Sequence, residues 1–177
     1  LFQHYETIAE AVSIPIVLYN VPGRTAVNIE PATIRRLAHI ENIVGVKEAS
    51  GNIAQIGMIC AQAPERFTVL SGDDVVTLPA IALGARGVIS VVANETPAEM
   101  TQLTRLCLAG KFEEARALHR RLLPLMEVNF AEPNPIPVKA AMAVMGLIEP
   151  VWRLPMCPPG PETMERIRGV LESMGLA

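Results

Sequence analysis

Lys47 ends a short apolar segment, residues 43–47, that is typical of a buried strand. Burial disfavours the charged form of an amine, and the neutral amine is the form that attacks a carbonyl carbon. Lysine is rare in this chain, and the other two, Lys111 and Lys139, stand where a solvated ammonium is ordinary. The alternative is that Lys47 is a solvated strand-end residue whose stem covers apolar surface.

Polar side chains follow four predicted strands at the point where each strand ends. They lie in residues 19–25, 47–51, 71–74 and 92–95. The carboxyl ends of parallel strands meet at one rim, where α/β proteins place their active sites. We therefore expect the phenol of Tyr19, the amine of Lys47 and the guanidinium of Arg24 to gather there. These groups suit amine catalysis on a keto acid, because the amine attacks the ketone, the phenol relays protons and the guanidinium binds a carboxylate.

Strand and helix patterns alternate through the first two-thirds of the chain. The expected strands cover residues 14–19, 43–47, 67–71 and 87–92, and the expected helices cover residues 2–12, 31–40, 53–63 and 75–83, with another from Pro97. Short, continuously apolar strands joined by helices predict a parallel sheet that is buried on both faces. This α/β pattern fits a doubly wound sheet or part of a (β/α)8 TIM barrel.

The strand pattern stops after residue 110. Helices are expected over residues 113–130, 138–148 and 161–175, and the proline-rich residues 132–137 predict a stiff extended linker. We therefore expect two regions: residues 1–110 with four strand–helix units, and residues 111–177 as a C-terminal helical appendage. The appendage shows no chemical motif and is expected to serve packing or oligomer assembly.

Composition argues against several classes of partner. The 177 residues are 50% hydrophobic and 19% charged, with a formal charge of −3, which is ordinary for a globular protein with a sizeable core. The mild acidity and the 4% of aromatic residues argue against nucleic acid or an anionic membrane as a partner. The three cysteines form no CxxC pair, so we expect neither disulfides nor a zinc site, and a cytoplasmic location.

Five short motifs stand in order along the chain. They are Tyr-Asn-Val-Pro-Gly-Arg-Thr at 19–25, Gly-Val-Lys-Glu-Ala at 45–49, Ser-Gly-Asp-Asp at 71–74, Gly-Val-Ile-Ser at 87–90 and Glu-Pro-Asn-Pro at 132–135. Together they resemble the motifs of the dihydrodipicolinate synthase and N-acetylneuraminate lyase family. The resemblance implies a (β/α)8 barrel, of which this chain carries the C-terminal half, and a Schiff base between lysine and pyruvate.

The resemblance also implies roles for individual residues. Lys47 resembles the Schiff-base lysine, and Tyr19 resembles the proton relay of imine formation and cyclisation. Arg24 resembles the residue that meets the second substrate's carboxylate, the backbone of Ile89 the group that touches pyruvate, and Gly72 the position that leaves room beside the imine. No metal and no organic cofactor is implied, because the lysine itself supplies the electron sink.

The reaction that the resemblance favours condenses pyruvate with L-aspartate 4-semialdehyde to 4-hydroxy-tetrahydrodipicolinate, in lysine and diaminopimelate biosynthesis. Arg24 favours this reaction, because a neutral polyol offers a guanidinium no partner. The alternatives are another pyruvate-dependent aldolase of the family, such as N-acetylneuraminate lyase or a 2-keto-3-deoxy sugar acid aldolase, and a non-catalytic assembly module. The family implies a homotetramer.

Asp73 and Asp74 are expected to cap the next helix rather than bind a metal ion.

The resemblance covers only the later part of the family's pattern, so we expect a fragment that lacks the preceding strands of the barrel. Half a parallel barrel would expose two strand edges and leave its interior unfilled. We therefore expect these residues on their own to aggregate or to stay unfolded, with negligible turnover.

Overall fold

The computed structural model describes residues 1–177 and divides them into two compact units. The first unit consists of Leu1–Ile89 with Cys107–Gly110, and the second consists of Ser90–Leu106 with Lys111–Ala177. The predicted boundary after residue 110 divides strand–helix units from the C-terminal helices, which is a different division from that into compact units. It stays a prediction. None of the helices is long and apolar enough to cross a membrane.

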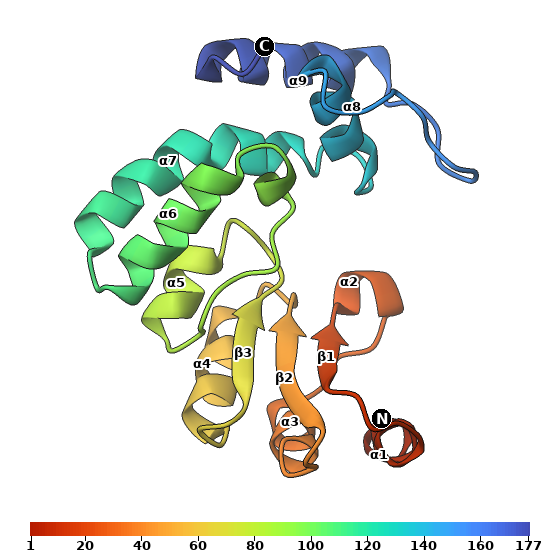
Figure 1. Cartoon of the computed structure of the whole chain (residues 1–177), viewed down its shortest axis with the longest axis vertical. Helices are drawn as coiled ribbons and strands as arrows, with labels where there is room; N and C mark the ends of the chain where they lie inside the picture. Colours follow the sequence, from red (N-terminus) through yellow and green to blue (C-terminus); the bar gives the residue numbers. More distant parts are fainter. The chain divides into compact units, whose positions relative to one another are not determined.

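Three parallel strands form the sheet of the first unit, in the order β1-β2-β3. They are β1 (Ile16–Asn20), β2 (Ile43–Glu48) and β3 (Thr68–Ser71). Their carboxyl ends lie at the same edge of the sheet (Figure 1). The unit's helices are α1 (Phe2–Ala11), α2 (Pro22–Thr25), α3 (Pro31–Leu37), α4 (Ile53–Gln62) and α5 (Thr77–Ala82). Three predicted strands and the helices between them are therefore confirmed, and α2 is an addition that the sequence pattern did not indicate.

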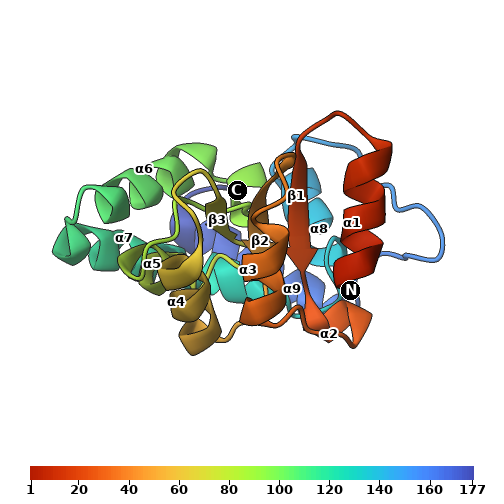
Figure 2. The same cartoon turned by 90° about the horizontal axis from the view of Figure 1, so that it is seen from below.

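The two faces of this sheet differ in burial because side chains alternate along each strand. One face is closed, and its side chains are Leu18, Asn20, Val46, Glu48, Val69 and Ser71, none of which is more than 3% exposed. Helices α3 and α4 lie on one side of the strands (Figure 2), and Gln55 of α4 hydrogen-bonds to Glu48 from that side. The opposite face carries Val17 and Tyr19, which are 49% and 42% exposed. This is the open face of the sheet, so the predicted burial of both faces is wrong here: no helix of the first unit covers the side chains of Val17 and Tyr19 as α3 and α4 cover the closed face.

The predicted strand over residues 87–92 is wrong in its extent. Only an isolated parallel bridge between Ser71 and Val88 joins this segment to β3, and the chain then enters the 3-10 helix η1 (Val92–Asn94). The Ser90 hydroxyl accepts a backbone N–H of that turn at 2.8 Å. The segment therefore pairs with β3 only at this bridge and continues into a local turn instead of a longer strand.

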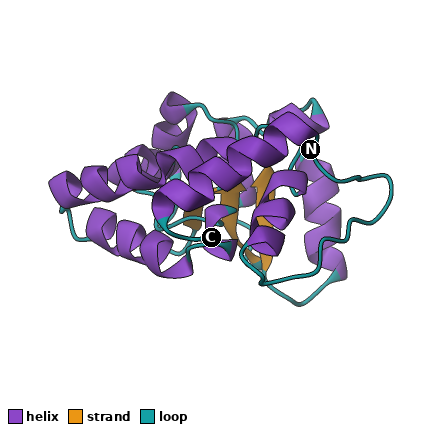
Figure 3. Ribbon diagram, turned by 90° about the horizontal axis from the view of Figure 1, so that it is seen from above, coloured by secondary structure: helices purple, strands orange, loops and turns teal.

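The second unit is built from helices and loops, and all the strands drawn in Figure 3 belong to the first unit. Its helices are α6 (Pro97–Leu108), whose last two residues belong to the first unit, α7 (Phe112–Val128), α8 (Ile136–Val144) and α9 (Pro161–Met174). The largest fully buried side chains of its core are Leu103, Leu122, Leu125, Met126, Ile167 and Leu171. The three helices predicted after residue 110 are therefore confirmed.

The predicted extended linker over residues 132–137 is also wrong in its second half. Helix α8 already begins at Ile136, and both Ile136 and Pro137 are buried in it. The Ile136 backbone N–H donates to the Pro133 carbonyl at 3.0 Å. The φ angle of proline suits the first helical turn as well as an extended segment, so the proline-rich sequence by itself does not distinguish the two.

The close approach of β2 and β3 depends on Gly45. A Cβ atom at this position would lie 2.5 Å from the backbone carbonyl oxygen of Thr68, its partner in the strand register. We expect Gly45→Ala to lower the free energy of unfolding by about 1–3 kcal/mol, because the strands must move apart. Urea unfolding of the protein from the complete reading frame that contains these residues measures this loss.

Gly169 is the matched control, because it lies inside α9 and a Cβ atom there meets nothing within 4 Å. Gly169→Ala should raise the free energy of unfolding by about 0.5–1 kcal/mol, since alanine loses less backbone entropy in a helix. A Gly45→Ala variant as stable as the unmodified protein would contradict the close approach of the strands.

Candidate active site

Lys47 and Tyr19 meet on the open face of the sheet. They are direct partners in the parallel register of β1 and β2, so their side chains leave the sheet on the same side. The Lys47 Nζ atom lies 4.3 Å from the centroid of the Tyr19 ring. Lys47 is half-buried, whereas Tyr19 is 42% exposed. An amine and a phenol that the sequence places 28 positions apart therefore share one small region at the carboxyl edge of the sheet.

Gly72 adjoins the Lys47 side chain. A Cβ atom at position 72 would lie 3.0 Å and 3.1 Å from the Cγ and Cε atoms of Lys47, and 2.7 Å from the Ala49 Cβ atom. The Gly72 backbone N–H donates to the Glu48 carbonyl at 2.7 Å, which holds the end of β3 against the end of β2. The absence of a side chain at this position therefore leaves the room that the Lys47 side chain occupies.

Arg24 and Ile89 lie outside the strands: Arg24 follows β1 in the sequence, and Ile89 lies beside the end of β3. Arg24 belongs to α2, which directly follows β1, and it is exposed. Ile89 is 42% exposed, and its backbone N–H donates to the Ser71 carbonyl at 2.9 Å, beside the end of β3. All five predicted site residues thus belong to the first unit, and within it Tyr19 and Gly72 both adjoin the Lys47 side chain.

The sequence predicted that the side chains of Asp73 and Asp74, which follow β3, cap the next helix. This prediction is wrong. The N-cap residue of α5 is Val76, and no side chain caps it. The Asp73 carboxylate instead accepts the Val75 backbone N–H at 3.1 Å, within the turn before the helix. Burial raises the pKa of Asp73 above its ordinary value, and the charge of Asp74 raises it further. A short turn between strand and helix therefore takes the place of the expected cap.

A buried polar network on the closed face was missed by the sequence interpretation. Glu48 has no exposed surface, and its carboxylate accepts hydrogen bonds from the amides of Asn20 and Gln55 and from the Ser50 backbone N–H. Asn28 joins the network through the amides of Asn20 and Gln55. A signal was available: Asn20 and Glu48 directly follow Tyr19 and Lys47, so strand alternation sends them to the other, buried face.

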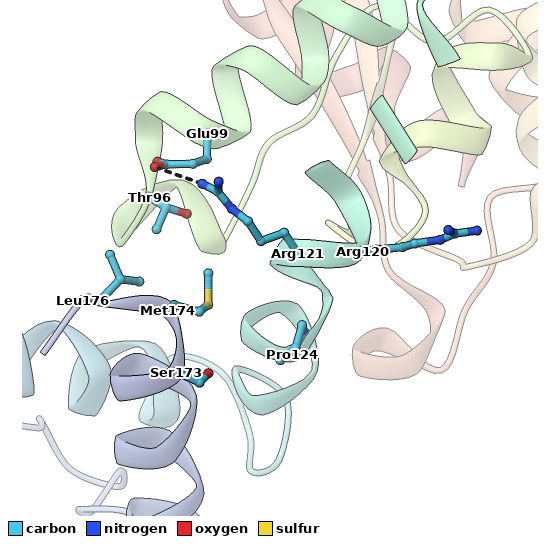
Figure 4. Close-up of a pocket in the computed structure, with 8 residues that line it drawn as sticks. All are labelled: Thr96, Glu99, Arg120, Arg121, Pro124, Ser173, Met174 and Leu176. Atoms are coloured by element: carbon cyan, nitrogen blue, oxygen red, sulfur yellow. Dashed lines mark ion pairs between the residues drawn. The ribbon is translucent and has the colours of Figure 1, made fainter. Parts of the chain in front are cut away.

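The second unit also contains a cavity of about 450 Å³, lined by the first turn of α6, the middle of α7 and the C-terminal end of α9. Figure 4 shows Arg121 directed toward Glu99, with an Nη2 to Oε1 distance of 3.7 Å, whereas the Arg120 side chain points away from the other labelled residues. Thr96, Pro124, Ser173, Met174 and Leu176 complete its lining. The arginine that faces the cavity is already paired, and no nucleophile stands beside a base, so this cavity offers no catalytic arrangement.

The chain belongs to the dihydrodipicolinate synthetase family, whose model matches residues 1–174. It is 52% identical over 175 residues to the 4-hydroxy-tetrahydrodipicolinate synthase of Koribacter versatilis, covering 99% of this chain and 58% of that protein. It is 48% identical over 176 residues to the enzyme of the same name from Archaeoglobus fulgidus, covering 99% of this chain and 61% of that protein. The chain thus spans about three-fifths of the length of these curated relatives.

Solved structures agree with the sequence comparison. The dihydrodipicolinate synthase of Thermotoga maritima superposes with a TM-score of 0.96 at 45% identity, covering 99% of this chain and 61% of that one. The chloride-inhibited enzyme of Acinetobacter baumannii, solved as a complex with pyruvate, superposes with a TM-score of 0.96 at 40% identity, covering 99% and 60% of the two chains. The predicted fold class is therefore confirmed: the chain has the fold of the later part of a (β/α)8 barrel followed by C-terminal helices.

The raised pKa of Asp73 has a consequence for stability. Below its ordinary pKa the carboxyl is protonated in both the folded and the unfolded state, and above the raised pKa the folded state holds a charge in a partly buried site. The contribution of Asp73 to stability therefore falls as the pH rises through this window. We expect Asp73→Asn, measured by urea unfolding, to be more favourable relative to the unmodified protein at pH 7 than at pH 4.

Glu10→Gln is the control for this comparison, since Glu10 is an exposed carboxylate on α1. Its effect on the free energy of unfolding should differ little between the two pH values. An Asp73→Asn effect that is the same at pH 4 and pH 7 would contradict the burial of the charge.

Proposed function

We propose that this chain supplies the lysine and tyrosine of a Schiff-base lyase that condenses pyruvate with L-aspartate 4-semialdehyde to 4-hydroxy-tetrahydrodipicolinate. One observation carries the proposal: in a member of this family, the Lys47 Nζ atom lies 4.3 Å from the centroid of the Tyr19 ring, across adjacent parallel strands. An amine can become a covalent catalyst here, because a proton donor and acceptor stands beside it.

The first step joins the chain to pyruvate. The neutral amine of Lys47 attacks the keto carbon, the keto oxygen leaves as water, and a protonated imine remains. This dehydration needs a proton delivered to the departing hydroxyl, and the phenol of Tyr19, whose ring lies beside the amine, can supply it. The imine nitrogen holds the positive charge that makes the next step possible.

The protonated imine then acts as an electron sink. The methyl group of the bound pyruvate loses a proton to the Tyr19 phenolate that the dehydration leaves. The resulting enamine attacks the aldehyde carbon of the semialdehyde, which forms the new carbon–carbon bond, and the alkoxide oxygen takes a proton from Tyr19. The amino group of the semialdehyde next attacks the imine carbon, closes the ring and releases the Lys47 amine. Tyr19 can take up and return protons in this closing step, so the reaction ends with both side chains in their initial state.

Three further residues are proposed to bind the substrates. The Arg24 guanidinium can bind the carboxylate of the semialdehyde with two parallel hydrogen bonds. The backbone of Ile89, beside the end of β3, is proposed to contact pyruvate, and Gly72 keeps the space next to the Lys47 Cε atom free of a side chain. Each of these assignments rests on the family motif together with the position of the residue at the carboxyl edge of the sheet.

We also propose how the protein assembles and where it is located. Membership of the family supports a homotetramer, which sedimentation velocity would distinguish from a monomer or dimer, and a cytoplasmic location in a cell that makes its own lysine. The chain spans about three-fifths of its curated relatives, so the proposed activity is that of the protein made from the complete reading frame.

Trapping the imine tests the proposed chemistry. Pyruvate with borohydride should add one reduced pyruvyl group to Lys47, which mass spectrometry of the digested protein locates. Lys47→Ala should abolish the adduct and lower kcat by at least about 10³-fold, because the amine that lies beside Tyr19 is removed.

Lys111 provides the matched control, because it is an exposed lysine that pairs with Glu114 at 3.3 Å in the second unit. Lys111→Ala should keep both the adduct and the turnover. A complete protein that forms no adduct with pyruvate, or that forms it equally well without Lys47, would overturn the proposed function.

Arg24→Ala tests the choice of the second substrate. Loss of charge-assisted hydrogen bonds should raise the KM for L-aspartate 4-semialdehyde about 10- to 100-fold, with a smaller effect on the rate of trapping with pyruvate alone. Steady-state kinetics measures the first quantity and borohydride quenching the second. Arg35→Ala, on the exposed side of α3, should change neither, and an unchanged KM in Arg24→Ala would favour a substrate without that carboxylate.

A further inference from the structure

We propose that Glu48 is a positioning residue for the reaction: its buried carboxylate binds Asn20 and thereby holds the β1–β2 register that sets Lys47 against Tyr19. The inference rests on the proposed function, since the reaction it serves begins with the Lys47 amine. It concerns the closed face of the sheet, opposite the side where the substrates are proposed to bind.

The surroundings of Glu48 are built for a hydrogen-bond acceptor. Glu48 has no exposed surface. Its Oε1 atom accepts the Ser50 backbone N–H at 2.7 Å, and its Oε2 atom accepts the Asn20 Nδ2 at 2.8 Å and the Gln55 Nε2 at 3.4 Å. All three partners are uncharged N–H donors, and a buried acidic side chain is costly unless such donors satisfy it. The segments that bring them together are β1, the turn after β2 and α4.

Both amide hydrogens and the amide oxygen of the Asn20 side chain form hydrogen bonds in this network. One Nδ2 hydrogen goes to Glu48, the other goes to the Asn28 Oδ1 atom at 2.9 Å, and the Asn20 Oδ1 atom accepts the Ile29 backbone N–H at 2.9 Å. A carboxylate on one side and a backbone N–H on the other leave only one orientation of the amide that satisfies both. The amide therefore joins the end of β1 to β2 and to the loop that follows α2.

The network and the reactive pair are adjacent steps of the same ladder. In the register of β1 and β2, Tyr19 stands opposite Lys47, and the next pair is Asn20 opposite Glu48. Successive side chains point to opposite faces, so a slip by one residue would send Lys47 to the closed face. The hydrogen bond between Asn20 and Glu48 opposes such a slip directly next to the reactive pair. It is a polar contact in a layer whose other members on these two strands, Leu18 and Val46, are apolar and tolerate sliding.

Glu48→Gln removes the acceptor that this network requires while it keeps the shape of the side chain. Whichever way the new amide turns, its NH2 group faces either the Asn20 and Gln55 donors or the Ser50 backbone N–H. We expect the rate constant for adduct formation at saturating pyruvate to fall about 10- to 100-fold, because a displacement of about 1 Å can cost a factor of that size. The KM for pyruvate should change much less, since Glu48 does not face the open side of the sheet.

A double substitution provides the decisive readout. In Asn20→Asp with Glu48→Gln, the carboxylate and the amide exchange sides: the new amide donates to residue 20 and accepts the Ser50 N–H, and the carboxylate at residue 20 still accepts the Ile29 N–H. The amides of Asn28 and Gln55 then turn over together, so that Asn28 donates to residue 20 and the Gln55 oxygen accepts from residue 48. We expect trapping in the double variant to be at least about fivefold faster than in Glu48→Gln, because the central hydrogen bond has returned with reversed polarity. A side chain that only contributes stability gives no reason for such a recovery.

Asn42 is the matched structural control. It is also a polar side chain of the first unit, and its Nδ2 atom donates to the Ala9 and Val12 carbonyls, both at 2.9 Å, at the amino-terminal end of β2. Asn42→Ala should lower the melting temperature but leave the rate constant per folded site unchanged. If Glu48→Gln does not fold, Gln55→Leu takes its place, because it removes only the 3.4 Å bond to Glu48 together with the bonds to Asn28, and several-fold slower trapping is expected.

The outcomes separate this inference from the proposed function. If the unmodified protein forms no adduct at Lys47, the proposed function fails. If the unmodified protein traps pyruvate while folded Glu48→Gln, or its Gln55→Leu substitute, traps it equally fast, the positioning role fails and the proposed function stands. Slowing by Asn42→Ala to the same degree, or a double variant no faster than Glu48→Gln, would likewise overturn the positioning role.

Discussion

The parallel pairing of β1 with β2 sets Tyr19 directly opposite Lys47, and the rest of the first unit depends on that register. Pleated strands send alternate residues to opposite faces, so one shift in the pairing would exchange the whole set of open and closed positions. The glycines at 45 and 72 belong to the same constraint, because each lets another group approach too closely for a side chain. The 4.3 Å distance between the Lys47 Nζ atom and the Tyr19 ring centroid therefore follows from how the strands of the sheet pair.

On the closed face, the buried carboxylate of Glu48 joins β1 to β2 on the side opposite Tyr19 and Lys47. Glu48 is surrounded by N–H donors from three segments, and such an arrangement is satisfied in only one alignment of the strands. Apolar neighbours add more to stability, but they discriminate poorly between alignments. A polar network in an apolar layer therefore exchanges some stability for a defined geometry of the two strands that carry Tyr19 and Lys47.

Much of the fold could be predicted from the sequence, and the failures have clear causes. The apolar segments that became β1, β2 and β3 were found because their β-branched and apolar residues form short runs bounded by turn residues. The burial of both faces that these runs predicted was wrong, because Val17 and Tyr19 are exposed. Residues 87–92 have the same composition, but a ladder also needs a run of partners, and the Ser90 turn removes them. At residues 132–137 the prolines suit an extended segment and a helix start equally, so only packing of Ile136 and Pro137 could decide.

The sequence by itself determined which chemical groups follow each strand, and therefore which edge of the sheet carries an amine, a phenol and a guanidinium. It did so because parallel strands separated by helices must bring their carboxyl ends together. Only the tertiary structure decided that Tyr19 and Lys47 are direct partners, that Gly72 adjoins the lysine and that Asn20 and Glu48 meet beneath them. Strand register is a relation between segments far apart in the chain, and it is settled by how their side chains pack and hydrogen-bond, not by either segment alone.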